Sequence, residues 1–186
     1  SASNKILIWL HGLGADSNDF APFFSNSCFN EYEIILPNAP HRKITLNQNF
    51  EMRAWFDMKS LNLDDLDEED FMKSSKILDA IIVDKLKKNP KTKIYIGGFS
   101  QGAALSIFYG LNSIYKINGV ISFSGFLPKF NYQNKIVTKP ILKVHGIYDD
   151  IINFQISKKT FDLLSFSNLV SKSYNMSHEV IEKQVV

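Results

Sequence analysis

Cysteine is almost absent from this chain of 186 residues, in which Cys28 is the only one. An intramolecular disulfide and a cysteine metal cluster are therefore excluded, and this usage fits a reducing compartment. No apolar run approaches the roughly 20 residues that span a bilayer, and no signal peptide is evident. We expect no stable membrane insertion and a cytoplasmic location. The chain begins with serine rather than methionine, which is compatible with removal of an upstream segment.

Net charge is also low, at a formal +2, which is too small to indicate a nucleic-acid partner. The only dense charge run is acidic, at 63–70, and is typical of a solvated loop that leads into a helix. Repeats, proline-rich linkers and low-complexity tracts are missing. A length of 186 residues with 45% hydrophobic content therefore predicts a single domain over 1–186.

Short apolar runs alternate with longer amphipathic stretches along the whole chain. The runs predict strands over 5–12, 32–40, 92–98, 117–125, 139–146 and 168–174. The stretches predict helices over 69–90, 101–111 and 154–164. Several of the strands are continuously apolar, which is typical of a mainly parallel central sheet with helices on both faces. The predicted class is α/β, and sites in such sheets gather beyond the carboxyl ends of the strands.

One serine lies between two glycines where a predicted strand ends, in GGFSQGA (97–103). Gly98, Ser100 and Gly102 fill the pattern G-x-S-x-G, in which a sharp strand-to-helix turn exposes a nucleophilic serine. The glycines avoid collisions with the neighbouring strand and helix, and the helix N-terminus adds free N–H groups. The pattern predicts Ser100 as a nucleophile, and the alternative is an ordinary helix N-cap.

A serine hydroxyl needs a base, usually a histidine that a carboxylate orients. In α/β-hydrolases the chain order is serine, acid, histidine. No Asp or Glu lies between Ser100 and His145, so His145 cannot complete this order. His178 is then the candidate base, and the alternative for it is a surface-loop histidine.

The candidate acids follow the predicted strand 139–146. Asp149 and Asp150 both lie just beyond it, where a triad acid belongs. The chain order of serine, acid and histidine does not choose between these two residues. Asp162 falls within a helical pattern and is expected at the surface. The alternative role for Asp149 is a turn residue or the N-cap of the following helix.

An oxyanion formed at Ser100 needs two preorganised donors, usually backbone N–H groups. Gln101, directly after the serine, is expected to supply one. The glycine-containing loop HGLGAD (11–16) is expected to supply the other, through the amide of Leu13. The alternative is that this loop is only a flexible turn.

Six motifs together resemble the phospholipase/carboxylesterase family of α/β-hydrolases, which includes acyl-protein thioesterases and lysophospholipases. They are LHGLGADSNDF (10–20), PNAP (37–40), MRAWFD (52–57), GGFSQGAAL (97–105), HGIYDD (145–150) and YNMSHEV (174–180). The resemblance covers nearly the whole chain. It implies Ser100 as nucleophile, Asp149 as acid and His178 as base, with the amides of Leu13 and Gln101 as oxyanion donors.

The same resemblance places 52–57 at the border of the active site. It implies that Trp55 and Phe56 help to form an acyl pocket, and ordinary packing of these rings is the alternative. The chain departs from the family at Ala103, where a second glycine is usual, and it lacks a proline shortly after Asp149. It also stops at EVIEKQVV, where relatives continue through a longer helix, which would leave apolar sheet surface uncovered.

The resemblance implies hydrolysis of carboxylic esters or thioesters through an acyl-enzyme, with no metal or cofactor. Small acyl esters, lysophospholipids and S-acylated proteins are the expected substrates. The sequence does not separate ester from thioester, and it shows neither the chain-length preference nor the oligomeric state. The alternatives are a non-catalytic binding or sensing protein of this fold, or a peptidase.

Overall fold

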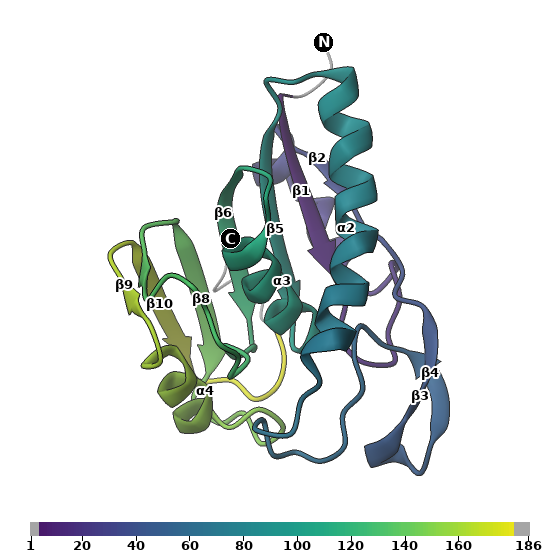
Figure 1. Cartoon of the computed structure of the whole chain (residues 1–186), viewed down its shortest axis with the longest axis vertical. Coiled ribbons are helices and arrows are strands. Elements are labelled where there is room, and N and C mark those ends of the chain that lie inside the picture. The colour runs from purple at the N-terminus through teal and green to yellow at the C-terminus, as the bar shows by residue number, and fades with distance from the viewer. Residues whose placement is uncertain (1–3, 181–186) are drawn as a thin grey trace.

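A six-stranded sheet in which every pairing is parallel forms the centre of the fold (Figure 1). The structure is a computed structural model that describes residues 4–180. The strands follow the order β10-β8-β6-β5-β1-β2 across the sheet. Their bounds are β1 Lys5–Leu10, β2 Glu33–Ile35, β5 Lys93–Phe99, β6 Ile117–Phe123, β8 Ile141–Gly146 and β10 Leu169–Tyr174. The predicted α/β class with a mainly parallel sheet is confirmed.

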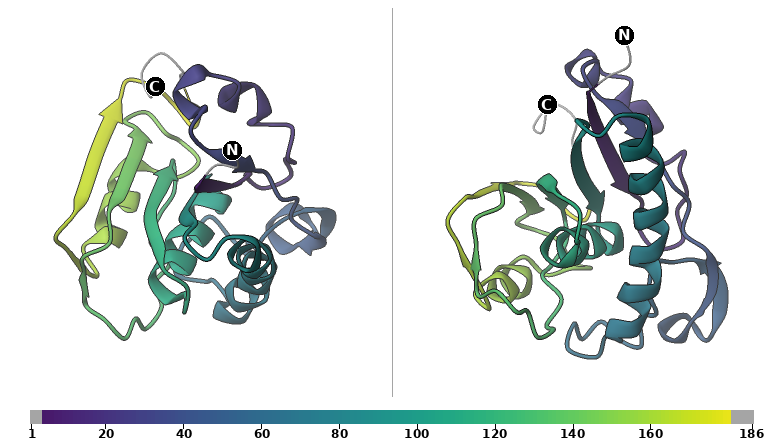
Figure 2. Two further views of the ribbon diagram at one scale, coloured as in Figure 1. Left: turned by 90° about the horizontal axis from the view of Figure 1, so that it is seen from above. Right: turned by 45° about the horizontal axis from the view of Figure 1, so that its top comes forward.

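Helices cover the two faces of the sheet unequally (Figure 2). The longer helices α2 (Glu68–Lys88), α3 (Gln101–Asn112) and α4 (Phe154–Phe161) pack on one face. The opposite face is covered by the four-residue helix α1 (Ala21–Phe24) and the 3-10 turn Ser27–Phe29. The carboxyl ends of the strands all lie at one edge of the sheet, at the bottom of Figure 1.

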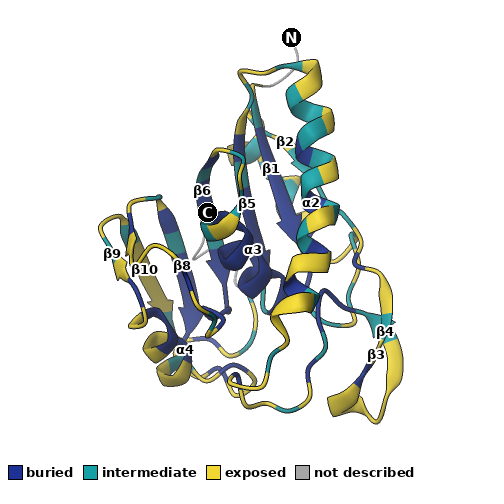
Figure 3. Ribbon diagram, in the orientation of Figure 1, coloured by how far each residue is buried: buried dark blue, intermediate teal, exposed yellow. Residues whose placement is uncertain are grey.

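The side chains of β1 alternate between two apolar cores. Ile6 and Ile8 belong to the larger core, under α2 and α3, whereas Trp9 points to the other face and packs against Phe20 and Phe123. Figure 3 shows the buried residues concentrated in the central strands and α3, while β10 and the outer side of α2 are exposed. A strand buried on both faces reads as a continuous apolar run, as the sequence has it.

Helix α2 begins and ends where its sequence provides caps. The side chain of Asp67 accepts a hydrogen bond from the Glu69 amide at 2.9 Å, and acidic residues fill the first turn. Lysines fill the last turn, where they complement the negative end of the helix dipole. Pro90 follows the end of the helix and prevents its continuation.

The predicted strand over 32–40 is shorter in the structure, because β2 ends at Ile35 before Pro37 and Pro40. The sequence analysis missed two small pairs of strands. They are the antiparallel hairpin β3 (His41–Ile44) and β4 (Phe50–Arg53), joined through the 3-10 turn Thr45–Asn47, and the pair β7 (Ile136–Val137) and β9 (Ser165–Phe166).

No helix within residues 4–180 has both the length and the apolarity needed to cross a bilayer. The expectation about the chain end at EVIEKQVV concerns residues 181–186, which lie outside the described residues.

Candidate active site

Ser100 stands in the turn between β5 and α3 with a backbone that non-glycine residues rarely adopt. Its φ is 55° and its ψ is −114°, and such strain persists only where the surroundings hold it. The Ser100 amide donates to the carbonyl of Phe123 at 2.8 Å, and its carbonyl accepts from the Ala104 amide at 3.1 Å. Within the described chain its hydroxyl makes no N-cap bond to α3, so that hydroxyl is available to a different partner.

Gly102 allows the first turn of α3 to lie directly against the end of β1. A Cβ at this position would overlap the carbonyl oxygens of Leu10 and His11. Any other residue would push α3 away from the sheet and displace Ser100 with it. The second glycine of the G-x-S-x-G pattern is therefore a steric requirement of this turn.

Three side chains from distant segments meet at the carboxyl edge of the sheet. The Nε2 atom of His178 lies 2.9 Å from the Oγ atom of Ser100. The Nδ1 atom of the same ring lies 2.8 Å from the Oδ2 atom of Asp149. These are hydrogen-bond distances, and they link the three residues in the order that serine activation requires.

Asp149 is buried, and its carboxylate accepts hydrogen bonds from backbone amides and from a histidine ring. Its Oδ1 atom accepts from the amides of Ile151 at 3.0 Å and Ile152 at 2.8 Å. Burial by itself works to raise the pKa of Asp149, but hydrogen bonds from His145, His178 and the Ile152 amide outweigh it and hold this pKa well below its ordinary value. An ionised carboxylate only accepts, so Nδ1 of His178 carries the ring proton and Nε2 can accept the proton of Ser100.

The loop that carries His178 is held against the loop that carries Asp149. Tyr148 donates its amide proton to the carbonyl of Met176 at 3.1 Å. A Cβ on Gly146 would overlap the carbonyls of Met176 and Ser177, so the two loops touch through their backbones. Contact at this distance fixes the position of His178 relative to Asp149. Asp150, the other candidate acid, is exposed.

The loop after β1 is ordered by His11. Its Nε2 accepts from the Ala39 amide at 3.0 Å, and its Nδ1 lies 2.7 Å from the carbonyl of Gly12, so the ring is neutral with its proton on Nδ1. Burial lowers the pKa of His11, in agreement with a neutral ring. The Gly14 amide donates to the Arg53 carbonyl at 2.8 Å. Within residues 4–180 the Leu13 amide has no such partner and remains available to a ligand.

Trp55 and Phe56 are fully buried in the larger core and do not line the pocket beside Ser100. Phe56 stacks on Phe71 with ring centroids 4.1 Å apart, and the Trp55 indole donates to the His11 carbonyl at 2.9 Å. The structure thus gives both rings a packing role, which differs from the direct part in an acyl pocket that the family resemblance implied.

A pocket of about 300 Å³ opens beside Ser100 and His178. Its wall also contains both expected oxyanion donors, Leu13 and Gln101. Besides Leu13, Ala15 and Phe99, the apolar part of the wall comes from four separate segments, with the residues Leu46, Met58, Leu61, Phe126, Ile151 and Ile152. Sequence analysis missed these residues, because isolated apolar residues in loops carry no pattern that separates a pocket wall from the core.

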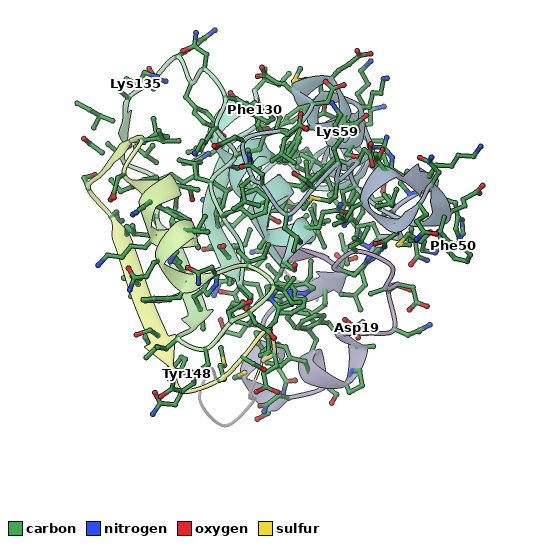
Figure 4. The ribbon with its side chains drawn as sticks, turned by 90° about the horizontal axis from the view of Figure 1, so that it is seen from below. Asp19, Phe50, Lys59, Phe130, Lys135 and Tyr148 are labelled. Carbon is green, nitrogen blue, oxygen red and sulfur yellow. The ribbon has the colours of Figure 1, made fainter. Side chains whose placement is uncertain are left out.

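Figure 4 shows this carboxyl edge from below. In the lower half of this view lie Asp19, which also lines the pocket, and Tyr148, which follows β8. Phe50, in the β3–β4 hairpin, lies at the right-hand edge of the molecule. Among residues 4–180, no three His, Cys, Asp or Glu side chains are grouped so that they could bind a metal ion.

Comparison with known sequences identifies a single family over the chain. The sequence model of the family described as Phospholipase/Carboxylesterase matches residues 1–186. Acyl-protein thioesterase 1 of Candida albicans is 33% identical over 207 aligned residues, which cover 100% of this chain and 89% of that protein. Acyl-protein thioesterase 1 homolog 1 of Dictyostelium discoideum is 41% identical over 139 residues, or 70% of this chain and 61% of that protein.

Solved structures share the fold over almost its whole length. The crystal structure of Arabidopsis thaliana SOBER1 aligns with a TM-score of 0.81 and 25% identity, and covers 97% of this chain and 93% of its own. Acyl-protein thioesterase 2 of Zea mays aligns with a TM-score of 0.82 over 98% of this chain and 90% of its own, at 24% identity.

Proposed function

Because this chain belongs to the phospholipase/carboxylesterase family, we propose that it hydrolyses carboxylic esters or thioesters of acyl chains, with Ser100 as nucleophile, His178 as base and Asp149 as acid. The observation that supports these roles most directly is the pair of contacts on one imidazole. Its Nε2 faces the Ser100 hydroxyl at 2.9 Å and its Nδ1 faces the Asp149 carboxylate at 2.8 Å.

The reaction divides into two acyl transfers. In the first, His178 Nε2 takes the hydroxyl proton as Ser100 Oγ attacks the acyl carbonyl carbon, and Asp149 stabilises the imidazolium. The tetrahedral intermediate then expels the alcohol or thiol, which leaves with the proton from His178. In the second transfer, His178 takes a proton from water, the resulting hydroxide attacks the acyl-enzyme, and the acid departs as Ser100 regains its proton.

The amides of Leu13 and Gln101 are the proposed donors to the oxyanion. Both residues line the pocket with Ser100, and the Gln101 amide is the first of α3, where no intrahelical acceptor exists. The partial positive charge at this helix end adds to their effect. Donors that are already fixed stabilise the developing charge without reorganisation during the reaction.

The apolar wall of the pocket is the proposed acyl-binding surface. Leu61, Ile151 and Leu46 line it and are 58%, 50% and 38% exposed, so the pocket opens to solvent. A leaving group of any size, including a protein, can stay outside while the acyl chain enters. Together with the names of the relatives, this openness supports an S-acylated cysteine of a protein as the substrate, ahead of a lysophospholipid or a small acyl ester.

Labelling with a fluorophosphonate tests the nucleophile directly. The wild-type chain should gain the mass of one phosphonyl group, and Ser100→Ala should gain none. With a p-nitrophenyl butyrate substrate, Ser100→Ala and His178→Gln should each lower kcat by about 10⁴- to 10⁶-fold. His41→Gln is the matched control, because His41 is exposed on β3, and it should leave kcat unchanged.

A folded wild-type chain that neither labels nor hydrolyses would contradict the proposal and favour a binding protein of this fold. For the substrate class, release of acyl groups from an S-acylated peptide should exceed release from a lysophospholipid at equal concentration. The reverse order would remove the thioester preference and leave the esterase activity in place.

A further inference from the structure

His145 is a fully buried histidine that the proposed reaction does not use. It lies in β8 directly before Gly146, the glycine whose backbone contacts the His178 loop, and its side chain is 0% exposed. Chain order already excludes it as the base for Ser100. Its ring nevertheless lies within bonding distance of the proposed acid.

The Nε2 atom of His145 has two oxygen neighbours on one turn. It lies 2.7 Å from the carbonyl oxygen of Ile152 and 3.2 Å from Oδ2 of Asp149. A carbonyl oxygen only accepts, so Nε2 must carry a proton and is the donor. One N–H therefore faces both the first and the last residue of the turn 149–152.

The other ring nitrogen shows that packing alone does not account for a histidine here. The Nδ1 atom is buried and has no hydrogen-bond partner among residues 4–180. Its ring packs against Phe154 with centroids 5.9 Å apart, an environment that an aliphatic side chain would also fill. An aliphatic residue would avoid the cost of a buried unpaired nitrogen. The polar interaction that His145 retains is the one with the turn.

We propose that His145 is a positioning residue, whose Nε2–H holds Asp149 toward His178 and holds Ile152 in the wall of the acyl pocket. The inference rests on the proposed function. Asp149 Oδ2 receives both His178 Nδ1 and His145 Nε2, so the two rings fix one oxygen from two directions. Ile152 lines the pocket, so the same donor connects the acid to the acyl-binding surface.

Three substitutions at one position separate donation from packing. His145→Gln places an amide N–H near the position of Nε2, His145→Asn has a shorter side chain that cannot reach it, and His145→Leu has no donor. With p-nitrophenyl butyrate, the Asn and Leu variants should lower kcat by about 10- to 100-fold, as expected for misplacement of a reacting group, with KM changed by less than about threefold. The Gln variant should restore kcat to within about threefold of wild type.

A folded Leu variant with wild-type kcat would overturn the proposal, and so would a Gln variant as slow as Leu. If the variants do not fold, a measurement on the wild-type chain still tests the proposal. ¹⁵N NMR should show a proton on Nε2 of His145, and a ring protonated on Nδ1 alone would overturn the proposal. These outcomes are separate from the proposed function, which fails only if the wild-type chain is inactive or Ser100→Ala is active.

Discussion

The side chain of Gln101 bridges the backbone of Trp55 and its neighbour. Its Oε1 accepts from the Trp55 amide at 2.7 Å, and its Nε2 donates to the carbonyl of Phe56 at 2.8 Å. Gln101 is buried, so the two backbone groups have no access to water. The residue next to the proposed nucleophile is thus a proposed oxyanion donor through its amide, and its side chain holds the segment that leads to Met58 in the pocket wall.

Gln101→Leu should therefore destabilise the fold rather than only slow the reaction. It leaves the Trp55 N–H and the Phe56 carbonyl buried and unpaired, at a cost of about 2–4 kcal/mol in the free energy of unfolding. Urea unfolding followed by fluorescence measures this change. Gln133→Leu, at an exposed position, is the control and should change stability by less than about 0.5 kcal/mol. Equal stability of the two variants would show that the bridge contributes nothing.

Asp149→Asn and Asp150→Asn compare two adjacent candidate acids. Asp149→Asn should lower kcat by about 10³- to 10⁴-fold, because an amide at this position does not favour the His178 tautomer with its proton on Nδ1. Asp150 is exposed, and its substitution should leave kcat near wild type. Steady-state rates on one ester give both values, and a larger loss for Asp150→Asn would move the acid role to that residue.

Asp149→Asn should also change how stability depends on pH in the acid range. Burial works to raise the pKa of Asp149, but its hydrogen bonds hold this pKa below its ordinary value. As pH falls, the carboxylate is therefore protonated in the unfolded state at a higher pH than in the folded state. Its contribution is complete above the unfolded pKa of about 3.9 and is lost as pH falls through the folded pKa. The stability difference between wild type and Asp149→Asn should shrink from pH 6 to pH 3. A difference that does not change with pH would exclude this linkage.

Ser100→Gly should be more stable than Ser100→Ala, although both lack the hydroxyl. Alanine keeps the Cβ that is strained at a φ of 55°, whereas glycine adopts this φ freely. Glycine relieves the backbone strain but costs more conformational entropy on folding. The free energy of unfolding of Ser100→Gly should therefore exceed that of Ser100→Ala by about 1 kcal/mol. Denaturant unfolding of both inactive variants tests this expectation. An equal midpoint would mean that the turn holds Ser100 without strain.

Lys143 is buried under α4, and Lys143→Met should raise stability at neutral pH. Its ammonium lies 5.5 Å from the ring of Phe154 and 5.1 Å from that of Phe161, and burial, with a smaller effect of Lys158, lowers its pKa to about 8. The charged form is thus disfavoured in the folded state. After the cation–π attraction is subtracted, methionine should gain about 1–2 kcal/mol at pH 7.

The stability that Lys143→Met gains over wild type should depend on pH. Between about pH 8 and the unfolded pKa of about 10.4, the unfolded chain holds more protons, so wild-type stability rises with pH. The advantage of Lys143→Met should therefore be largest below pH 8 and shrink toward pH 10. Thermal unfolding at several pH values measures it, with Lys172→Met on the exposed strand β10 as control. A stability loss at pH 7 would show that the ammonium is stabilising.

Sequence by itself determined the features that depend on neighbouring residues. A buried parallel strand is continuously apolar and a capped amphipathic helix carries its own signals, so the α/β class and the bounds of α2 were predicted within a residue or two. The G-x-S-x-G pattern around Ser100 is also readable locally, although the carbonyls that Gly102 must avoid belong to the distant end of β1. Chain order narrowed the base to His178, and the role of that residue stays a prediction.

Tertiary structure decided what depends on residues far apart in the chain. Ser100 and His178 are 78 positions apart, and only the packing of two loops at the sheet edge brings their side chains to 2.9 Å. Trp55 and Phe56 lie in the core rather than in the pocket. The residue type does not distinguish these two environments, because aromatic rings are common in both. The contact of His145 with Asp149 is likewise set by the shape of one turn, since a hydrogen bond forms only where donor and acceptor meet at the required distance and angle.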